Sequence, residues 1–267
     1  MVREADGKRN FKLMIYFVPA RKDSKRIPNK NTLKVLGKPL IQYTLDLVSE
    51  MSKDKSYSGP VYVSTDDEVI IQIAKSYGFN WYKRDEELCS DRAKMSDVLF
   101  DAVNLFELEE KDICVLYPTS PLRLADHVRE ACIVWKQKQN PVSTLMSVCP
   151  VLYRPYGLME IQANGFLHCK HPYGELFYQG QNQPVDYRAN GAIYIIPKQV
   201  ILKREINSQL FNKTTIPYVM DPISSLEIDT PEDILIAEHY LSKKNTAKFI
   251  YSPTVTNPKD SYAFSSH

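Results

Sequence analysis

Residues 12–40 read KLMIYFVPARKDSKRIPNKNTLKVLGKPL and join an apolar run to a loop that is rich in cations. Leu13 to Val18 is the kind of short apolar run that forms a strand covered on both faces, and Pro19 cannot donate to a sheet ladder, so the strand should end there. The next residues hold five positive charges within ten positions, at Arg21, Lys22, Lys25, Arg26 and Lys30. This density of cations favours a loop that binds a polyphosphate.

The sequence excludes two familiar phosphate-binding loops, because it lacks their consensus motifs. A Walker A loop needs GxxxxGK[ST] and a dinucleotide fingerprint needs GxGxxG, whereas this loop has no glycine before Gly37. Cationic side chains must therefore bind the phosphates, as backbone N–H groups do in those two loops. A run of Lys and Arg can also be a solvated face or a weak nucleic-acid patch, and both alternatives stay open. The position just beyond a strand end favours the ligand site, because open α/β sheets bind ligands there.

Strand and helix patterns alternate along the chain after this loop. Apolar stripes at helical spacing predict helices near 40–51, 69–77, 98–106 and 128–135, with Ser96 or Asp97 capping the third of them. Runs of β-branched and aromatic residues predict strands near 61–65, 81–82, 113–116, 142–148, 192–196 and 216–220. Such alternation predicts an α/β fold with a doubly wound, mostly parallel sheet.

The pattern breaks down between about residues 149 and 187, where short pieces are rich in Pro, Gly, Tyr and His. We expect an insertion here within a domain that covers residues 11–244. A long, partly ordered surface excursion is the alternative to a structured arm. Residues 1–10 form a polar extension, and residues 245–267 lack periodicity and are expected to be a tail with little order.

The segment Leu226-Glu227-Ile228-Asp229 alternates apolar and acidic residues, which predicts a strand end. Thr230 should then cap a helix that opens with Pro231, because proline suits the first helical position. Side chains two residues apart on a strand share a face, so the two carboxylates could hold a hard cation such as Mg²⁺. They could also be surface acids that the helix dipole favours.

Composition bounds the class of protein. The chain has 267 residues, 43% of them hydrophobic, and a formal net charge of +2, so the cations of residues 21–30 are a local feature. This balance argues against nucleic acid as a partner. No apolar run reaches the length of a membrane span and the N-terminus lacks a signal-peptide core, so we expect a cytoplasmic protein without a membrane partner. The five cysteines lack regular spacing, which argues against a disulfide scaffold.

Six sequence words occur in a fixed order: PARKDSKRIPNKN, GKPLIQYTL, VSTDD, PTSPLR, YRANGAIYI and LEIDTPEDILIAE. Together, over about residues 11–241, they resemble the acylneuraminate cytidylyltransferases, also called CMP-sialic acid synthetases. The resemblance implies a fold like that of nucleotide-diphospho-sugar transferases, with Mg²⁺ as cofactor and with CTP and an acidic sugar as substrates. It also implies that the insertion is an antiparallel dimerisation arm in a homodimer, lending residues to the partner's site.

The resemblance assigns roles to residues that match its motifs. Catalytic roles fall to Arg21, Lys25 and Asp229, and metal binding falls to Asp229 and Glu227. The nucleotide would be bound by Arg21, Ser24, Lys25, Lys30, Asn31, Arg84 and Asp91. The sugar would be bound by Tyr117, Thr119, Ser120, Arg123, Arg188 and Asn190. An Arg can bond a carboxylate through two N–H groups at once, so Arg188 and Arg154 are candidates to hold the carboxylate of the sugar.

Several positions depart from the family pattern. Glu227 replaces the usual Asp of the metal motif, Tyr117 replaces a Gln that touches the sugar, and Lys94 and Met95 replace a Ser pair. An Arg that grips the sugar carboxylate has no clear counterpart near Gly180. The favoured function is transfer of CMP from CTP to an acidic keto-sugar such as a sialic acid. A related nucleotidyltransferase with another acceptor, and a non-catalytic nucleotide-binding homologue, are the alternatives.

Overall fold

The computed structural model of the chain describes residues 14–106, 112–138, 140–151, 155–171 and 185–243. The predicted extension at 1–10, the predicted tail at 245–267 and part of the predicted insertion lie outside these residues. Their predictions therefore remain expectations.

Strands and helices alternate along the described chain. The strands are β1 (Ile15–Pro19), β2 (Lys34–Val35), β3 (Lys38–Pro39), β4 (Val61–Thr65), β5 (Asn80–Lys83), β6 (Asp112–Val115), β7 (Leu145–Pro150), β8 (Met159–Ile161), β9 (Leu167–Cys169), β10 (Tyr187–Pro197) and β11 (Ile216–Val219). The α-helices are α1 (Leu40–Met51), α2 (Glu68–Ser76), α3 (Glu86–Cys89), α4 (Met95–Leu105), α5 (Ala125–Lys138), α6 (Lys198–Leu202) and α7 (Pro231–Ser242), and short 3₁₀ turns are η1 (Lys30–Thr32) and η2 (Pro155–Gly157). None of these described helices has the length and apolar character that a membrane span requires.

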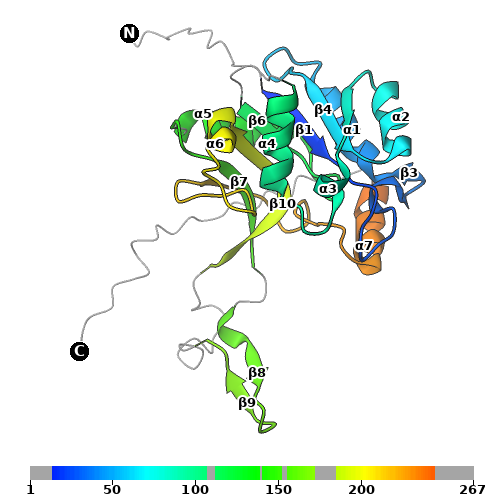
Figure 1. The fold of residues 1–267 in the computed structure, drawn as a ribbon. Coiled ribbons are helices and arrows are strands. Elements are labelled where there is room, and N and C mark those ends of the chain that lie inside the picture. Colours follow the sequence, from blue (N-terminus) through cyan, green and yellow to red (C-terminus); the bar gives the residue numbers. More distant parts are fainter. Residues whose placement is uncertain (1–13, 107–111, 139, 152–154, 172–184, 244–267) are drawn as a thin grey trace, which may run out of the picture.

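Within the described residues, seven strands form the main sheet in the order β11-β7-β10-β6-β1-β4-β5. β1 runs parallel to β4 and β6, β4 to β5, and β7 to β11. β10 is antiparallel to both of its neighbours, β6 and β7. Helices cover both faces of the sheet (Figure 1). The predicted doubly wound, mostly parallel α/β fold is confirmed.

The two faces of the main sheet bury separate cores, and β1 contributes to both. Its alternate side chains divide between them, Tyr16 and Val18 on one face and Ile15 and Phe17 on the other. The first core includes the buried sides of α1, α2 and α5, and the second includes those of α4 and α6. All of β1 is buried, which accounts for its unbroken apolar sequence.

A third, smaller cluster fixes the loop after β1. Ile27 of that loop packs with Val35, Leu40, Ile228 and Ala237, which come from β2, α1, the segment before α7 and α7 itself. Each of these five side chains is at most 6% exposed. The cluster therefore holds the cation-rich loop against a segment some two hundred residues further along the chain.

Two local predictions are wrong. Residues 226–229 were expected to be a strand, but they form no strand and precede α7 as an irregular segment. Ile228 N–H donates to the carbonyl of Thr119 at 2.8 Å, so this backbone is bonded to a loop and not to a sheet ladder. The N-cap of α4 is Lys94, without a side-chain cap, so Ser96 and Asp97 both lie within the helix, and Asp97 pairs with Arg204 at 2.6 Å.

The insertion contains a small antiparallel hairpin. β8 pairs with β9 in a two-stranded sheet of its own, which lies away from the main sheet (Figure 1). Val151 N–H donates to the carbonyl of Asp186 at 2.8 Å, so the two ends of the insertion are adjacent. An antiparallel hairpin within the predicted insertion is confirmed, and we call residues 151–186 the arm.

Candidate active site

The residues predicted to bind phosphate lie beyond the carboxyl end of β1. We call residues 20–33 the cation loop. Ala20 N–H continues the pairing to the carbonyl of Ser64 at 2.9 Å, and the chain then leaves the sheet. Asn31 Nδ2 donates to the carbonyl of Arg21 at 2.8 Å, so this predicted nucleotide residue orders the loop from within. Ser24 lies partly exposed in the same loop.

Asp91 gathers the two predicted catalytic cations of the loop. Its carboxylate lies 2.7 Å from Arg21 Nη2 and 3.1 Å from Lys25 Nζ. Hydrogen bonds from Arg21 and then from Lys25 lower the pKa of the Asp91 carboxyl. Arg21 Nη1 also donates to the carbonyl of Cys89 at 3.0 Å. A carboxylate is an acceptor without a proton to donate to phosphate, so Asp91 positions the two cations in this structure.

Asp229 pairs with two further cations of the loop, Arg26 and Lys30. Its carboxylate lies 3.0 Å from Lys30 Nζ and 3.0 Å from Arg26 Nη1. Lys30 also donates to the carbonyl of Ile228 at 2.9 Å, and its side chain is only 13% exposed. Sequence reasoning gave no site role to Arg26, although its charge in the same cluster was the available signal.

Glu227, two residues before Asp229, is bonded to a loop of the protein. Thr119 Oγ1 donates to Glu227 Oε1 at 3.2 Å. Burial is the main cause that raises the pKa of the Glu227 carboxyl, and the nearby charge of Asp229 raises it further. Gly191 lies against the same carboxylate: a Cβ added there would be 3.0 Å from each of its oxygens. Gly191 also has a φ of +67°, which disfavours any other residue.

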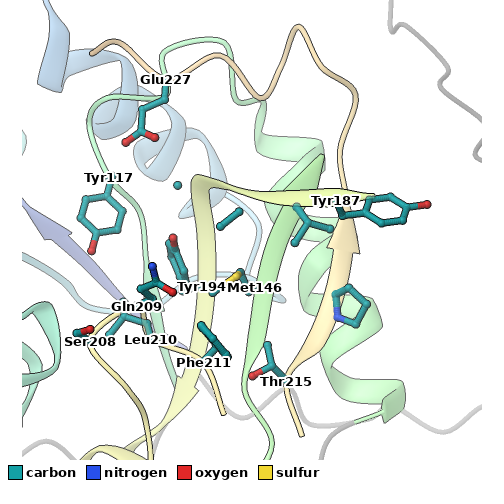
Figure 2. A pocket seen from close by; sticks show the side chains of 14 residues that line it. Tyr117, Met146, Tyr187, Tyr194, Ser208, Gln209, Leu210, Phe211, Thr215 and Glu227 are labelled. Atoms are coloured by element: carbon teal, nitrogen blue, oxygen red, sulfur yellow. The ribbon is translucent and has the colours of Figure 1, made fainter. Parts of the chain in front are cut away.

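A cavity of about 740 Å³ opens beside Glu227 (Figure 2). We call it the β10 pocket; it is lined by Tyr117, Met146, Val148, Tyr187, Ala189, Gly191, Tyr194, Ser208, Gln209, Leu210, Phe211, Thr215, Pro217 and Glu227. The pairing of β10 with β7 is irregular between Ala189 and Tyr194, where β10 bulges at the pocket wall. The Tyr117 and Tyr194 rings meet edge to face, with centroids 5.8 Å apart.

Asn190 fixes that irregularity from the interior. It is 0% exposed, accepts from Ser147 Oγ at 2.6 Å and donates to Ser225 Oγ at 2.8 Å. Ser147 Oγ in turn accepts from Ile193 N–H at 2.7 Å. Asn190 was predicted to bind the sugar, but here its polar groups are used to shape the backbone beside the pocket.

Three arginines and a serine with predicted ligand roles differ in their exposure to solvent. Arg123 is 4% exposed and donates to the carbonyl of Ala192 at 2.6 Å and to Thr44 Oγ1 at 2.7 Å, and burial lowers its pKa to about 10. Arg84 is 5% exposed and donates to the side chain and carbonyl of Ser64. Ser120 is also buried, whereas Arg188 is exposed. Arg123 therefore bonds to β10 and α1 and Arg84 to β4, and the ligand roles of both remain predictions.

The donors present suit a hard cation. Asp229 and Glu227 offer carboxylate oxygens, the ligands that Mg²⁺ prefers, and Mg²⁺ commonly uses one or two carboxylates together with substrate phosphates and water. The described residues hold no group of three or more His, Cys, Asp or Glu side chains able to bind a metal on their own. The residues thus fit a cation that arrives with a phosphate ligand.

A parallel sheet with helices on both faces and a cation loop beyond its first strand is typical of α/β proteins that bind nucleotides. The sequence profile of one such family, described as cytidylyltransferase, matches residues 15–252. The chain belongs to the cytidylyltransferase family.

Individual relatives agree with this assignment. The chain is 34% identical over 243 residues to an N-acylneuraminate cytidylyltransferase of Escherichia coli O18:K1:H7, covering 88% of this chain and 54% of that protein. It is 31% identical over 239 residues to a CMP-N,N'-diacetyllegionaminic acid synthase of Legionella pneumophila, covering 86% and 97%. It is 28% identical over 227 residues to a pseudaminic acid cytidylyltransferase of Campylobacter jejuni, covering 83% and 93%. The chain thus spans about half the length of the first relative and nearly all of the other two.

The fold is shared with a solved structure as well. A CMP:2-keto-3-deoxy-manno-octonic acid synthetase complexed with CTP superposes with a TM-score of 0.61 at 16% identity. The match covers 87% of this chain and 100% of that one. At this identity the likeness shows the fold alone.

Proposed function

We propose that the protein transfers CMP from CTP to an acidic keto-sugar and releases pyrophosphate. A hydroxyl oxygen of the sugar attacks the α-phosphorus and loses its proton to solvent, the bond from that phosphorus to the bridging oxygen breaks, and pyrophosphate leaves with the bonding electrons. Relatives named for sialic, legionaminic and pseudaminic acids support this class of acceptor. The single observation that carries the proposal is the junction at residues 227–229, where the cation loop meets the β10 pocket.

The residues divide this work between them. Arg21, Lys25 and Ser24 would contact the phosphates, where fixed cations oppose the charge that develops as pyrophosphate leaves. Lys30 and Arg26 hold Asp229 at the phosphate side of the junction. Asp229, with Glu227, would hold Mg²⁺, which supplies charge neutralisation to the triphosphate when bound. The pocket beside Glu227 would orient the acceptor, and orientation alone can lower a barrier by several kcal/mol.

The proposal is tested by pyrophosphate release from CTP with a panel of sugar acids. Turnover with a nine-carbon keto-acid is the expected result. Turnover only with some other acceptor would indicate a related nucleotidyltransferase, which the replacement of the family's Gln by Tyr117 favours. CTP binding without turnover of any acceptor would indicate a non-catalytic homologue.

Lys25→Ala is expected to reduce kcat/KM. The variant loses one charge-assisted contact to phosphate, which is worth about 1.5–3 kcal/mol of transition-state stabilisation. Steady-state kinetics with varied CTP measures the loss. Lys53→Ala, the removal of an exposed cation just after the C-terminus of α1, is the matched control. Activity equal to that of the unchanged protein in Lys25→Ala would remove the loop from the mechanism.

Gly191→Ala is expected to lose both stability and activity. The new Cβ must occupy a left-handed backbone conformation, at a cost of about 1–2 kcal/mol, and it also presses on the Glu227 carboxylate. Gly78→Ala is a matched control, because Gly78 has a φ of +69° but nothing lies within 4 Å of its added Cβ. Denaturant unfolding should show a loss in both variants, and pyrophosphate release should fall in Gly191→Ala alone. Full activity of Gly191→Ala would show that Glu227 can move without consequence.

A further inference from the structure

The carboxyl end of β4 supports two parts of the candidate active site at once. β4 lies between β1 and β5 in the main sheet (Figure 1). On one side the carbonyl of Ser64 accepts from Ala20 N–H at 2.9 Å, where the cation loop begins. On the other side the carbonyl of Thr65 accepts from Arg84 N–H at 2.8 Å. The residues that follow Thr65 therefore lie between the cation loop and the segment that carries Arg84 and Asp91.

Asp66, the first residue after β4, contacts the cation loop directly. Its Oδ1 accepts from the backbone N–H of Lys22 at 2.7 Å. Lys22 directly follows Arg21, the cation that pairs with Asp91 at 2.7 Å. A hydrogen bond from a backbone N–H to a carboxylate is charge-assisted and stronger than one between neutral groups. The bond thus fixes the backbone beside a cation that is proposed to contact phosphate.

Asp66 also faces the segment between β5 and α4. Burial is the main cause that raises the pKa of the Cys89 thiol to about 11, and the Asp66 carboxylate contributes through its charge and through a hydrogen bond. The carbonyl of the same cysteine accepts from Arg21 Nη1 at 3.0 Å. Asp66, Lys22, Arg21 and Cys89 therefore form a closed set of contacts that joins three separate segments of the chain.

We infer that Asp66 is a positioning residue that directs Arg21 and so sets where the cation loop receives a phosphate. The inference rests on the proposed function and adds to it a residue that lies behind the phosphate-binding cations. The next residue, Asp67, has a different task, because its carboxylate accepts from Val69 N–H at 2.8 Å and caps α2. The two adjacent aspartates of VSTDD thus serve the site and a helix end respectively.

Asp66→Ala and Asp66→Asn together test this role. Ala removes the acceptor of the Lys22 N–H, whereas Asn keeps a carbonyl oxygen that can accept from it. We expect kcat/KM for CTP to fall by about tenfold or more in Asp66→Ala, because small displacements of positioned groups have effects of this size. KM for CTP should rise and KM for the acid should stay unchanged, and Asp66→Asn should recover most of the loss. Full activity of Asp66→Ala, or an equal loss in both variants, would overturn the inference.

Asp67→Ala is the matched control. It removes the neighbouring carboxylate, which is also bonded to a backbone N–H. Denaturant unfolding should show a loss of stability, because α2 loses its N-cap, whereas calorimetric affinity for CTP should stay unchanged. An equal loss of CTP affinity in Asp66→Ala and Asp67→Ala would refute the inference, since it would show a general disturbance at the end of β4.

Two further measurements do not depend on CTP. The Lys22 amide hydrogen should exchange with solvent faster in Asp66→Ala than in the unchanged protein, because its acceptor is lost. The Cys89 thiol should react faster with iodoacetamide in the same variant, because its pKa falls when the carboxylate is removed. Cys169, which is also partly exposed, is the internal control and should react at the same rate in both proteins. Unchanged exchange at Lys22 and unchanged alkylation of Cys89 would contradict the inference.

The proposed function and this inference can fail separately. If the unchanged protein binds CTP but releases no pyrophosphate with any acid, the proposed function fails. Calorimetric titration of the Asp66 and Asp67 variants with CTP, together with amide exchange and alkylation, then decides the inference. Weaker CTP binding in Asp66→Ala alone, with recovery in Asp66→Asn, supports it, and equal CTP affinities in all the proteins would refute it.

Discussion

Asp229→Asn is expected to reduce kcat/KM by at least about 100-fold, equivalent to about 2.7 kcal/mol of transition-state stabilisation. The substitution removes the carboxylate that Lys30 and Arg26 contact, each at 3.0 Å, and removes the better placed of the two proposed metal ligands. Asp229 also directly precedes the N-cap of α7, and helix N-termini favour nearby phosphate oxygens. Pyrophosphate release and calorimetric CTP binding, each with varied Mg²⁺, measure the effect.

Control variants separate this role from a structural one. Asp97→Asn removes another ion-paired aspartate, whose side chain is 37% exposed against 36% for Asp229, and it should leave turnover unchanged. Glu227→Gln should be milder than Asp229→Asn, because Glu227 is already bonded to Thr119 and can act through a metal-bound water. Glu227→Asp should be tolerated, because Asp is the usual residue of the family at this position of the metal motif. Small and equal effects of Asp229→Asn and Glu227→Gln would place the metal elsewhere.

The main sheet could be predicted because its signals are local. β1 is buried on both faces and therefore reads as one apolar run, and the helical stripes of α1 and α2 follow from one buried side each. Pro231 and Thr230 mark the start of α7, where the Asp233 carboxylate accepts from Thr230 N–H at 2.7 Å. Each of these features depends on residues a few positions apart.

The junction at Asp229 could not be predicted in the same way. Lys30 and Asp229 are 199 positions apart, and they meet in the tertiary structure, where Ile27 and Ile228 belong to one buried cluster. Alternation at residues 226–229 resembled a strand, but the same alternation arises when Ile228 is buried under a loop and its backbone bonds to Thr119. Periodicity reports which side chains are buried, and it does not report which backbone groups pair.

A sequence motif also could not show which of its residues contact a ligand and which only hold those residues in place. Arg123 and Asn190 belong to words shared with the family, yet both are at most 4% exposed and bonded to the protein itself. A buried Arg or Asn that is bonded to neighbouring parts of the protein is as constrained as one that binds substrate. Burial, which the sequence does not give for polar residues, was the missing information.

Deletion of the arm is expected to abolish dimerisation and to reduce turnover by about 100-fold or more, the size of effect that follows when a residue completing a site is lost. We propose that the arm packs on a second copy of the chain. Ile161, Phe166 and Leu167 of its hairpin are 74%, 71% and 66% exposed, and apolar groups gathered in this way mark interaction surfaces. Because Val151 N–H bonds the carbonyl of Asp186, a short glycine-containing turn can replace residues 152–185 without separating β7 from β10.

Three measurements are needed for the deletion variant. Sedimentation reports its oligomeric state, pyrophosphate release at several protein concentrations reports its turnover, and calorimetry reports its binding of CTP. CTP binding should persist, because the cation loop belongs to the main body and not to the arm, and its persistence would show that the body still folds. Ile161→Ser should weaken association, whereas Glu160→Ser, the neighbouring position on the opposite face of β8, should not. Dilution of the unchanged protein should lower its specific activity as the dimer dissociates. A monomer with full activity would show that each copy completes its own site and would leave the exposed hairpin for another partner.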